Sequence, residues 1–126
     1  MHVAGFVIPV PEENQSTYRL WAANSAKLFR EYGCLEIVEC WEDNVPDGKH
    51  TDFRRAVDAK AGEKIVFTWQ IWSDKATLEA AEERMSTDPC FDIPEDIPFD
   101  PTRLIFGTFT PIHASLRSQG EKRAAS

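Results

Sequence analysis

The chain has 126 residues, of which 42% are hydrophobic and 28% are charged, and this suits one domain with a single hydrophobic core. Its formal net charge of −7 opposes binding to nucleic acid or to an anionic membrane surface. No apolar run approaches the roughly 20 residues of a membrane helix, and we expect no signal peptide before the first predicted strand. We therefore expect a cytoplasmic protein that binds neither nucleic acid nor membrane.

The N-terminal part of the chain predicts a strand followed by a helix. Val3–Val10 has the composition of a strand, and we expect Pro9 and Pro11 to end it because proline has no N–H for the ladder. Glu12–Tyr32 then changes to helical spacing, and Gly33 is placed to end this helix. One apolar stripe along the helix contains Tyr18, Trp21, Ala22, Ser25, Leu28, Phe29 and Tyr32.

A second strand is predicted at Cys34–Glu42, and its mixed polarity favours the edge of a sheet. A period of two places four of its side chains on one face, namely Leu35, Ile37, Glu39 and Trp41. The polar segment Asp43–Gly62 follows. We expect Phe53, Ala56 and Val57 to tether this segment to the core or to form a short extended piece.

The stretch Glu63–Trp72, EKIVFTWQIW, predicts the central strand of the fold. One face is wholly apolar and carries Ile65, Phe67, Trp69 and Ile71. The other face still contains Val66 and Trp72. A strand with one solvated face would carry polar residues at every second position. Because this strand does not, we expect it to be covered on both faces and Trp69 to be buried.

The C-terminal part predicts one more helix and one more strand. Ser73 or Asp74 can cap a helix that runs to about Thr87. Asp88–Pro101 contains four prolines and is expected to be an irregular lid or interaction segment. A last strand is predicted at Arg103–Pro111. We therefore place a single domain at residues 1–113 and a polar, frayed tail at residues 114–126.

The predicted order of elements is β-α-β-β-α-β, which is typical of an α+β, ferredoxin-like antiparallel sheet with two helices on one face. The strand order would be 4-1-3-2, which puts Glu63–Trp72 inside the sheet. The apolar side chains on the other face need a cover, and a second copy of the sheet is the simplest candidate. The pattern therefore predicts a homodimer.

Several separated strings resemble a bacterial family, the domain-of-unknown-function family numbered fourteen twenty-eight, within the dimeric α/β-barrel group. The matching strings are GFVIPVP (Gly5–Pro11), LEIVEC (Leu35–Cys40), VPDGK (Val45–Lys49), VFTW (Val66–Trp69) and PFDPTRLIFGTF (Pro98–Phe109). The chain departs from the family pattern at Asp52, where Ser is usual, and at Cys90, where an Arg often stands. The resemblance implies a ferredoxin-like protomer in a dimeric α/β barrel, and it implies no established reaction.

The sequence contains no clear signature for metal or nucleophilic chemistry. The three histidines, His2, His50 and His113, lie far apart, so we expect neither a metal site nor a cofactor. Cys34 and Cys40 would lie about 20 Å apart in a straight strand, which predicts two free thiols rather than a disulfide. Cys90, in the proline-rich segment, is expected to be an exposed thiol.

The most suggestive feature is aromatic, and it predicts a ligand cleft between helix and sheet. Trp21 can face a sheet that carries Trp69 or Trp72, with Phe6 and Phe106 on neighbouring strands and with Tyr18 and Asn24 at the margin. Glu39 shares a strand face with apolar residues, and His50 lies near Asp52 in a polar loop. The candidate pocket residues are therefore Trp21, Asn24, Glu39, His50, Trp69 and Trp72. The alternative is a filled aromatic core.

Two classes of function stay open at this point. The first is a small homodimer that binds an apolar or aromatic small molecule, or a protein partner. The second is a cofactor-free enzyme similar to monooxygenases or isomerases that act on aromatic compounds, which is an analogy at the level of the fold. A preformed cavity with Glu39, Asn24 or His50 beside an aromatic wall would favour the enzyme, and a solid core with an apolar dimer face would favour the first class.

Overall fold

The computed structural model describes residues 1–87 and 97–117, and the order of its main elements is the predicted β-α-β-β-α-β. The strands are β1 (His2–Pro11), β2 (Cys34–Trp41), β3 (Glu63–Trp72) and β4 (Ile105–Phe109). The helices are α1 (Gln15–Glu31), which follows the short 3-10 turn η1 (Glu12–Asn14), then the single turn α2 (Phe53–Ala56), and α3 (Lys75–Thr87).

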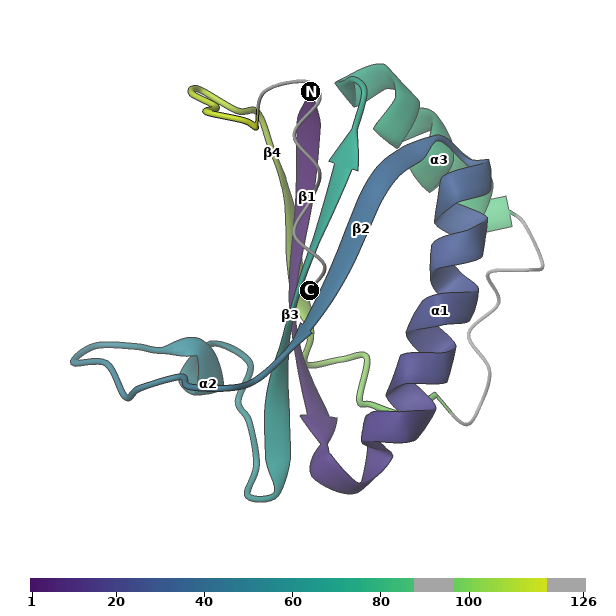
Figure 1. The fold of residues 1–126 in the computed structure, drawn as a ribbon. Coiled ribbons are helices and arrows are strands. Elements are labelled where there is room, and N and C mark those ends of the chain that lie inside the picture. Colours follow the sequence, from purple (N-terminus) through teal and green to yellow (C-terminus); the bar gives the residue numbers. More distant parts are fainter. Residues whose placement is uncertain (88–96, 118–126) are drawn as a thin grey trace.

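The four strands form one antiparallel sheet in the order β2-β3-β1-β4. The helices α1 and α3 both lie on one side of this sheet, and we call the opposite side the outer face (Figure 1). The predicted strand order, the inner position of β3 and the edge position of β2 are thereby confirmed. The architecture is α+β and is compatible with a ferredoxin-like fold.

The prediction that Pro9 ends the first strand is wrong, because Pro9 is buried inside β1 and pairs with Ile65. Ile65 directs its backbone N–H toward the β2 side, where it donates to Glu42 Oε1 at 2.9 Å. In an antiparallel pair, two residues that lie opposite each other direct their backbone N–H and C=O groups either both toward each other or both away. The backbone of Pro9 therefore points away from Ile65, toward the β4 side. Strand β4 pairs with β1 only over Val3–Val7, so the missing N–H of Pro9 removes no ladder bond.

The predicted face of β2 is correct for Ile37, Glu39 and Trp41 but wrong for Leu35. The register shifts at the start of the strand, where Cys34 pairs with Trp72 and Glu36 already pairs with Ile71. Leu35 is the extra residue in this bulge, and it is 57% exposed. A bulge changes the parity of a strand, which a strict period of two does not anticipate.

The ends of the helices follow the predicted signals with small shifts. Helix α1 begins at Gln15 rather than Glu12, and Gly33 follows it with φ of +107°, a conformation that glycine adopts readily. The carboxylate of Asp74 accepts the backbone N–H of Thr77 at 2.7 Å and so caps α3 as predicted. Of the two alternatives predicted for Phe53, Ala56 and Val57, the short extended piece is wrong, because Phe53–Ala56 forms the helical turn α2. The tether to the core is confirmed for Val57, which is buried.

The last strand is shorter than predicted. Strand β4 covers Ile105–Phe109 rather than Arg103–Pro111, since Arg103 belongs to the turn before the strand. Residues 88–96 of the predicted lid segment, including Cys90, lie outside the described residues, as do residues 118–126 of the predicted tail. Of that segment, Pro98 and Phe99 are buried in the described part.

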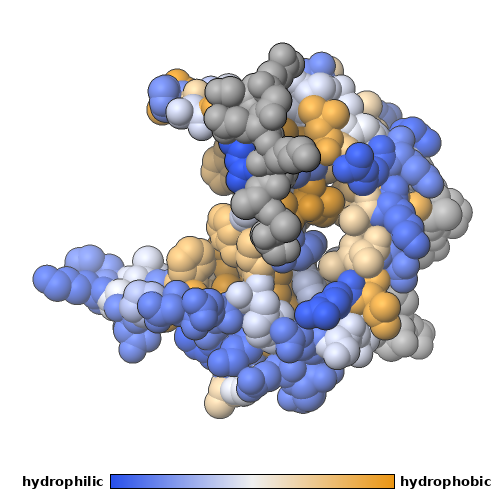
Figure 2. All heavy atoms as spheres, in the orientation of Figure 1, coloured by the Kyte–Doolittle hydropathy of each residue, from blue (hydrophilic) through white to orange (hydrophobic). Residues whose placement is uncertain are grey.

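The hydrophobic core lies between the sheet and its two helices, and it has two parts. The first contains Ile8, Val10, Tyr18, Ala22, Val66 and Phe99. The second contains Tyr32, Cys34, Trp72, Leu78 and Ala81. Trp69 is on the outer face and only partly buried in the single chain, which corrects the prediction that it is buried. The reason is that both helices cover the other face of β3, the one that carries Val66 and Trp72. Figure 2 shows apolar side chains that also reach the surface on the outer side of the sheet, next to α2.

Candidate functional site

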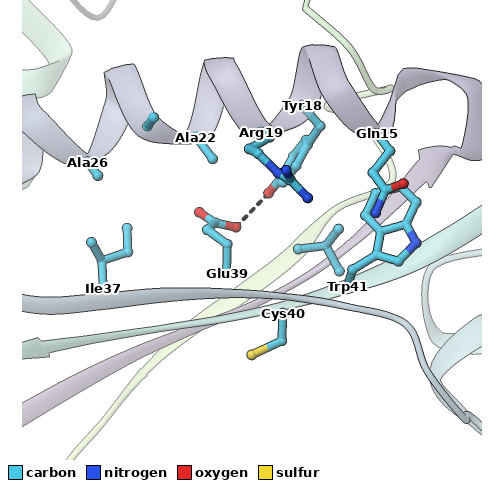
Figure 3. Close-up of a pocket in the computed structure, with 11 residues that line it drawn as sticks. Gln15, Tyr18, Arg19, Ala22, Ala26, Ile37, Glu39, Cys40 and Trp41 are labelled. Atoms are coloured by element: carbon cyan, nitrogen blue, oxygen red, sulfur yellow. Dashed lines mark hydrogen bonds between the residues drawn. The ribbon is translucent and has the colours of Figure 1, made fainter. Parts of the chain in front are cut away.

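A cleft lies between α1 and the edge of the sheet at β2 (Figure 3). Its helical wall is formed by Tyr18, Ala22 and Ala26, and its sheet wall by Ile37 and Glu39. Alanine side chains on the helix are too short to fill the space above β2, and they leave an open cavity of about 280 Å³. Figure 2 shows this gap between α1 and the sheet.

The carboxylate of Glu39 is the main polar group inside the cleft. The hydroxyl of Tyr18 donates to Glu39 Oε1 at 2.7 Å, and the hydroxyl of Thr68 donates to the same oxygen at 2.5 Å. Tyr18 is 3% exposed and Thr68 is 2% exposed, so both donors are fixed in the core. A carboxylate can only accept hydrogen bonds, and these two hydroxyls therefore hold Glu39 in one orientation.

The second oxygen of Glu39 faces the cavity. Within the described part of the chain, Glu39 Oε2 accepts no hydrogen bond. Every buried side-chain nitrogen or oxygen in that part has a partner, so Oε2, which has none, is not buried and is reachable from the cleft. Figure 3 shows one oxygen of Glu39 directed to Tyr18 and the other turned away from it, below Ala22. This oxygen can accept a hydrogen bond from a bound molecule.

Burial holds Tyr18 in its protonated form. Loss of solvation raises the pKa of the Tyr18 hydroxyl far above its ordinary value, and the neighbouring charge of Glu39 raises this pKa further. The Tyr18 hydroxyl therefore keeps its proton across the neutral range and remains a donor. The side chain positions Glu39 and is unsuited to act as a base.

A smaller cavity of about 90 Å³ lies deeper between α1 and the sheet. Glu39, Thr68 and Gln70 supply its polar wall. Trp21 and Phe99 supply part of its apolar wall. Glu39 lines both this inner cavity and the open cleft, so the carboxylate stands at the junction of the two.

The segment before β4, residues 97–104, closes the inner cavity. Asn14 donates its side-chain amide to the carbonyl of Pro98 at 3.0 Å. The ring of Phe99 makes edge contacts with Tyr18 and Trp21, at centroid distances of 5.8 and 5.0 Å. The aromatic cluster therefore includes a residue from the proline-rich segment.

An ion-pair cluster fixes this segment to the start of β3, and we call it the clamp (Arg103, Glu63 and Asp100). Arg103 binds both oxygens of Glu63, with distances of 2.7 and 2.6 Å, and its Nε donates to Asp100 at 2.9 Å. Such a forked contact fixes orientation as well as charge. Hydrogen bonds from Arg103 lower the pKa of Glu63.

Two of the six predicted site residues, Trp21 and Glu39, are brought together at the inner cavity, and of these two only Glu39 also lines the cleft. Trp72 is fully buried near α3, where its indole N–H donates to Gln70 at 3.1 Å. Trp69 lies on the outer face, and its indole N–H points to a carboxylate of β2 at 3.5 Å. The structure separates these two tryptophans by the thickness of the sheet.

Asn24 and His50 are not placed at the cleft. Asn24 is exposed on α1, and His50 is exposed in the loop that projects beside α2 (Figure 1). Asp52, expected near His50, instead caps α2 by accepting the backbone N–H of Arg55 at 2.8 Å. This hydrogen bond and one from the N–H of Gly48 lower the pKa of Asp52.

Three residues of the site were not predicted from the sequence. Thr68 and Gln70 are the polar residues on the face of β3 that the helices cover. The alternation of β3 places them on the same face as Val66 and Trp72, so the sequence does contain a signal for them. Phe99 reaches the inner cavity from a distant segment, and no local pattern indicates that contact. Among residues 1–87 and 97–117, no three side chains of His, Cys, Asp or Glu form a group that could hold a metal ion. Over the same ranges, no helix has the length and apolarity needed to cross a membrane.

Comparison with known proteins gives a family but no activity. The family model described as protein of unknown function (DUF1428) matches residues 1–101. Similar relatives include the proteins named "Uncharacterized protein YbaA" of Escherichia coli K12, Escherichia coli O157:H7 and Shigella flexneri. Each is 46% identical over 112 residues, which cover 88% of this chain and 96% of the relative.

Proposed function

The chain belongs to the DUF1428 family of proteins of unknown function, and we propose that it binds a small, mainly apolar molecule with one hydrogen-bond donor in the cleft between α1 and the sheet. The observation that carries this proposal is the carboxylate of Glu39. One of its oxygens is occupied by Tyr18 and Thr68, and the other is open to the cavity.

The size and chemistry of the cleft support a ligand of about one ring. A dry cavity of about 150 Å³ can hold benzene, and natural ligand sites begin at about 300 Å³. The cleft, at about 280 Å³, falls between these values. Its carboxylate and the net charge of −7 disfavour an anion, and the one arginine in its lining, Arg19, is exposed to solvent. A neutral phenol, alcohol or amine would bury its apolar part against Ala22 and Ala26 and donate to Glu39.

A matched pair of ligands tests this proposal. In isothermal titration calorimetry, para-ethylphenol should bind about ten- to a hundredfold more tightly than para-ethylanisole, because only the phenol donates a hydrogen bond to the charged carboxylate. In Glu39→Gln this preference should fall sharply. Glu31→Gln, at an exposed position near the end of α1, is the control and should keep it. Equal affinity of the two ligands for the unmodified protein would contradict the proposal.

A second candidate is a cofactor-free isomerase, and the open oxygen of Glu39 favours it over an oxygenase. A carboxylate can take a proton from a carbon that lies between a carbonyl and a C=C bond, leave a dienolate, and return the proton to the far carbon of that C=C bond. Phenylacetone in deuterium oxide is a suitable probe, because proton abstraction exchanges its benzylic hydrogens for deuterium. Exchange above the buffer rate that is lost in Glu39→Gln would support the enzyme, and exchange at the buffer rate would contradict it.

We also propose that the protein is a cytoplasmic homodimer, paired through the outer face of the sheet in the manner of a dimeric α/β barrel. An apolar surface on this face, the outer patch, consists of Val3, Val7, Phe67, Trp69, Ile105 and Phe109. Phe67 is 42%, Ile105 44% and Phe109 59% exposed in the single chain. A contiguous apolar patch of this kind is typical of an interface, which would bury on the order of 1,600 Å².

Light scattering coupled to size exclusion tests the dimer. The unmodified protein should elute as a dimer at micromolar concentration, and Phe67→Asp should make it a monomer because a charge would be buried in the interface. Leu20→Asp is the control, since Leu20 is 69% exposed on α1, away from the outer patch. A monomeric unmodified protein would remove this part of the proposal.

A further inference from the structure

Three cavities lie side by side between the sheet and its helices. The open cleft at β2 holds Glu39 and has about 280 Å³, and the inner cavity has about 90 Å³. A third space of about 380 Å³, the distal cavity, lies under α3 at the β4 end of the sheet. Its walls include Leu78 and Met85 of α3 and Phe106 and Thr108 of β4.

Neighbouring cavities share their walls. Ile37 and Glu39 line both the open cleft and the inner cavity. Phe6, Phe29, Gln70 and Leu104 line both the inner and the distal cavity. A single layer of side chains therefore separates each space from the next. Joining the spaces requires rotamer changes of these side chains.

Polar groups are distributed unevenly along this row. The open cleft has the accessible oxygen of Glu39, with Arg19 and Gln15 also in its lining. The distal cavity is lined mainly by apolar side chains, and its polar members are Glu82, Thr108 and Gln70. Glu82 and Thr108 are exposed to solvent, and the side-chain oxygen of Gln70 already accepts the indole N–H of Trp72 at 3.1 Å. One end of the row therefore suits a polar head group, and the other suits a hydrocarbon.

We infer that the three cavities act as one channel whose ligand is a straight-chain amphiphile, with a hydroxyl or amine head at Glu39 and an unbranched tail that reaches the distal cavity under α3. This inference rests on the proposed function and names its ligand class. Branched or fused-ring molecules would not pass the inner cavity, which has only about 90 Å³.

The geometry of the sheet sets the length of the tail. The row runs from β2 across β3 and β1 to β4, which is three strand spacings and so about 14 Å. Carbon–carbon bonds of about 1.5 Å advance an extended chain by roughly 1.3 Å each, so a tail of about ten carbons spans the row. Affinity should increase about three- to fourfold for each added methylene until the distal cavity is filled.

The experiment compares two primary alcohols, hexanol and decanol, by calorimetry and by NMR of isotope-labelled methionine methyl groups. The chain contains only two methionines, Met1 and Met85, and Met85 lines the distal cavity. We expect decanol to bind more than fiftyfold more tightly than hexanol and to shift the Met85 signal, which hexanol leaves in place. Met85→Leu assigns that signal.

A blocking variant tests the channel independently. Thr108→Trp should fill the distal cavity from an exposed position on β4, reducing the affinity for decanol to near that for hexanol and leaving hexanol unaffected. Ala80→Trp, which adds the same ring at an exposed position of α3 outside the lining of the three cavities, is the control.

The outcomes separate the channel from the cleft. If hexanol binds in a manner that depends on Glu39, but decanol binds no more tightly and leaves Met85 unchanged, the channel is wrong and the proposed cleft stands. If neither alcohol nor para-ethylphenol binds, the proposed function fails, and the channel fails with it. Tight binding of decanol with no effect of Thr108→Trp would place the tail elsewhere and overturn the inference.

Discussion

Replacing Arg103 tests whether the clamp holds residues 97–104, the segment that lines the inner cavity with Phe99 and Leu104. In Arg103→Met the carboxylate of Glu63 loses both of its guanidinium contacts, at 2.6 and 2.7 Å. The Glu63 side chain is 8% exposed, and its remaining donor is the backbone N–H of Lys60 at 2.6 Å. The variant therefore leaves an almost buried carboxylate with one of its three hydrogen bonds, and it also removes the hydrogen bond from Arg103 to Asp100.

The size of the effect follows from this geometry. Removing one partner of a buried ion pair costs about 3–5 kcal/mol, and the remaining donor from Lys60 reduces this, so we expect a loss of about 2–4 kcal/mol in the free energy of unfolding. The total free energy of unfolding of a domain is about 5–15 kcal/mol. Arg103→Lys keeps the positive charge but not the two-atom contact with Glu63, so the free energy of unfolding should fall by less, about 1–2 kcal/mol. Urea unfolding followed by circular dichroism near pH 7 measures both values.

The stabilisation that Arg103 provides should depend on pH. Hydrogen bonds from Arg103 lower the pKa of Glu63, and hydrogen bonds from Thr102 and Arg103 lower the pKa of Asp100 to about 2. A carboxyl group whose pKa falls on folding stabilises the protein above its unfolded pKa, about 4, and loses this contribution as the pH falls through the folded value. The difference between the unmodified protein and Arg103→Met should therefore be constant above about pH 5 and shrink toward pH 2. A difference below about 0.5 kcal/mol at neutral pH would refute the role of the clamp.

Three further predictions concern the core, a helix end and a thiol. In the Phe67→Asp background, which should be monomeric, Trp72→Ala should cost about 3–5 kcal/mol in urea unfolding because Trp72 is 0% exposed, and Trp69→Ala should cost less; the reverse order would contradict the face assignment. Gly33→Ala should lower the melting temperature by several degrees, since φ is +107° and an added Cβ would lie 2.9 Å from Thr77; an unchanged melting temperature would disprove the strain. Burial raises the pKa of the Cys34 thiol, so it should react with a thiol reagent only on unfolding, and rapid reaction of the native protein would contradict its burial.

The sequence was sufficient to predict the sheet, because the strand patterns are local. The alternation of Glu63–Trp72 and its apolar length indicate an inner strand, and the mixed polarity of β2 indicates an edge. Both faces of β3 carry a tryptophan, so the pattern alone did not decide which face the helices cover. The structure places Trp72 under α3 and Trp69 on the outer face.

The cleft was only partly predictable, because a cavity depends on the volumes of side chains from separate elements. Trp21 and Glu39 were selected since their patterns place them on faces that point to the core. The space itself comes from Ala22 and Ala26, which read as ordinary helix formers in the sequence. Phe99 enters from a proline-rich segment whose path depends on Arg103 and Glu63 rather than on its own composition.

A crystal structure of the protein with para-ethylphenol would show directly whether Glu39 binds the hydroxyl of a ligand in the cleft. We expect the ring between α1 and β2, against Ala22 and Ala26, with the phenol oxygen about 2.5–3.0 Å from Glu39 Oε2. The hydroxyls of Tyr18 and Thr68 should remain bound to Oε1. A ring bound on the outer patch with the cleft empty, or a phenol oxygen in the cleft directed away from Glu39, would contradict the proposed function.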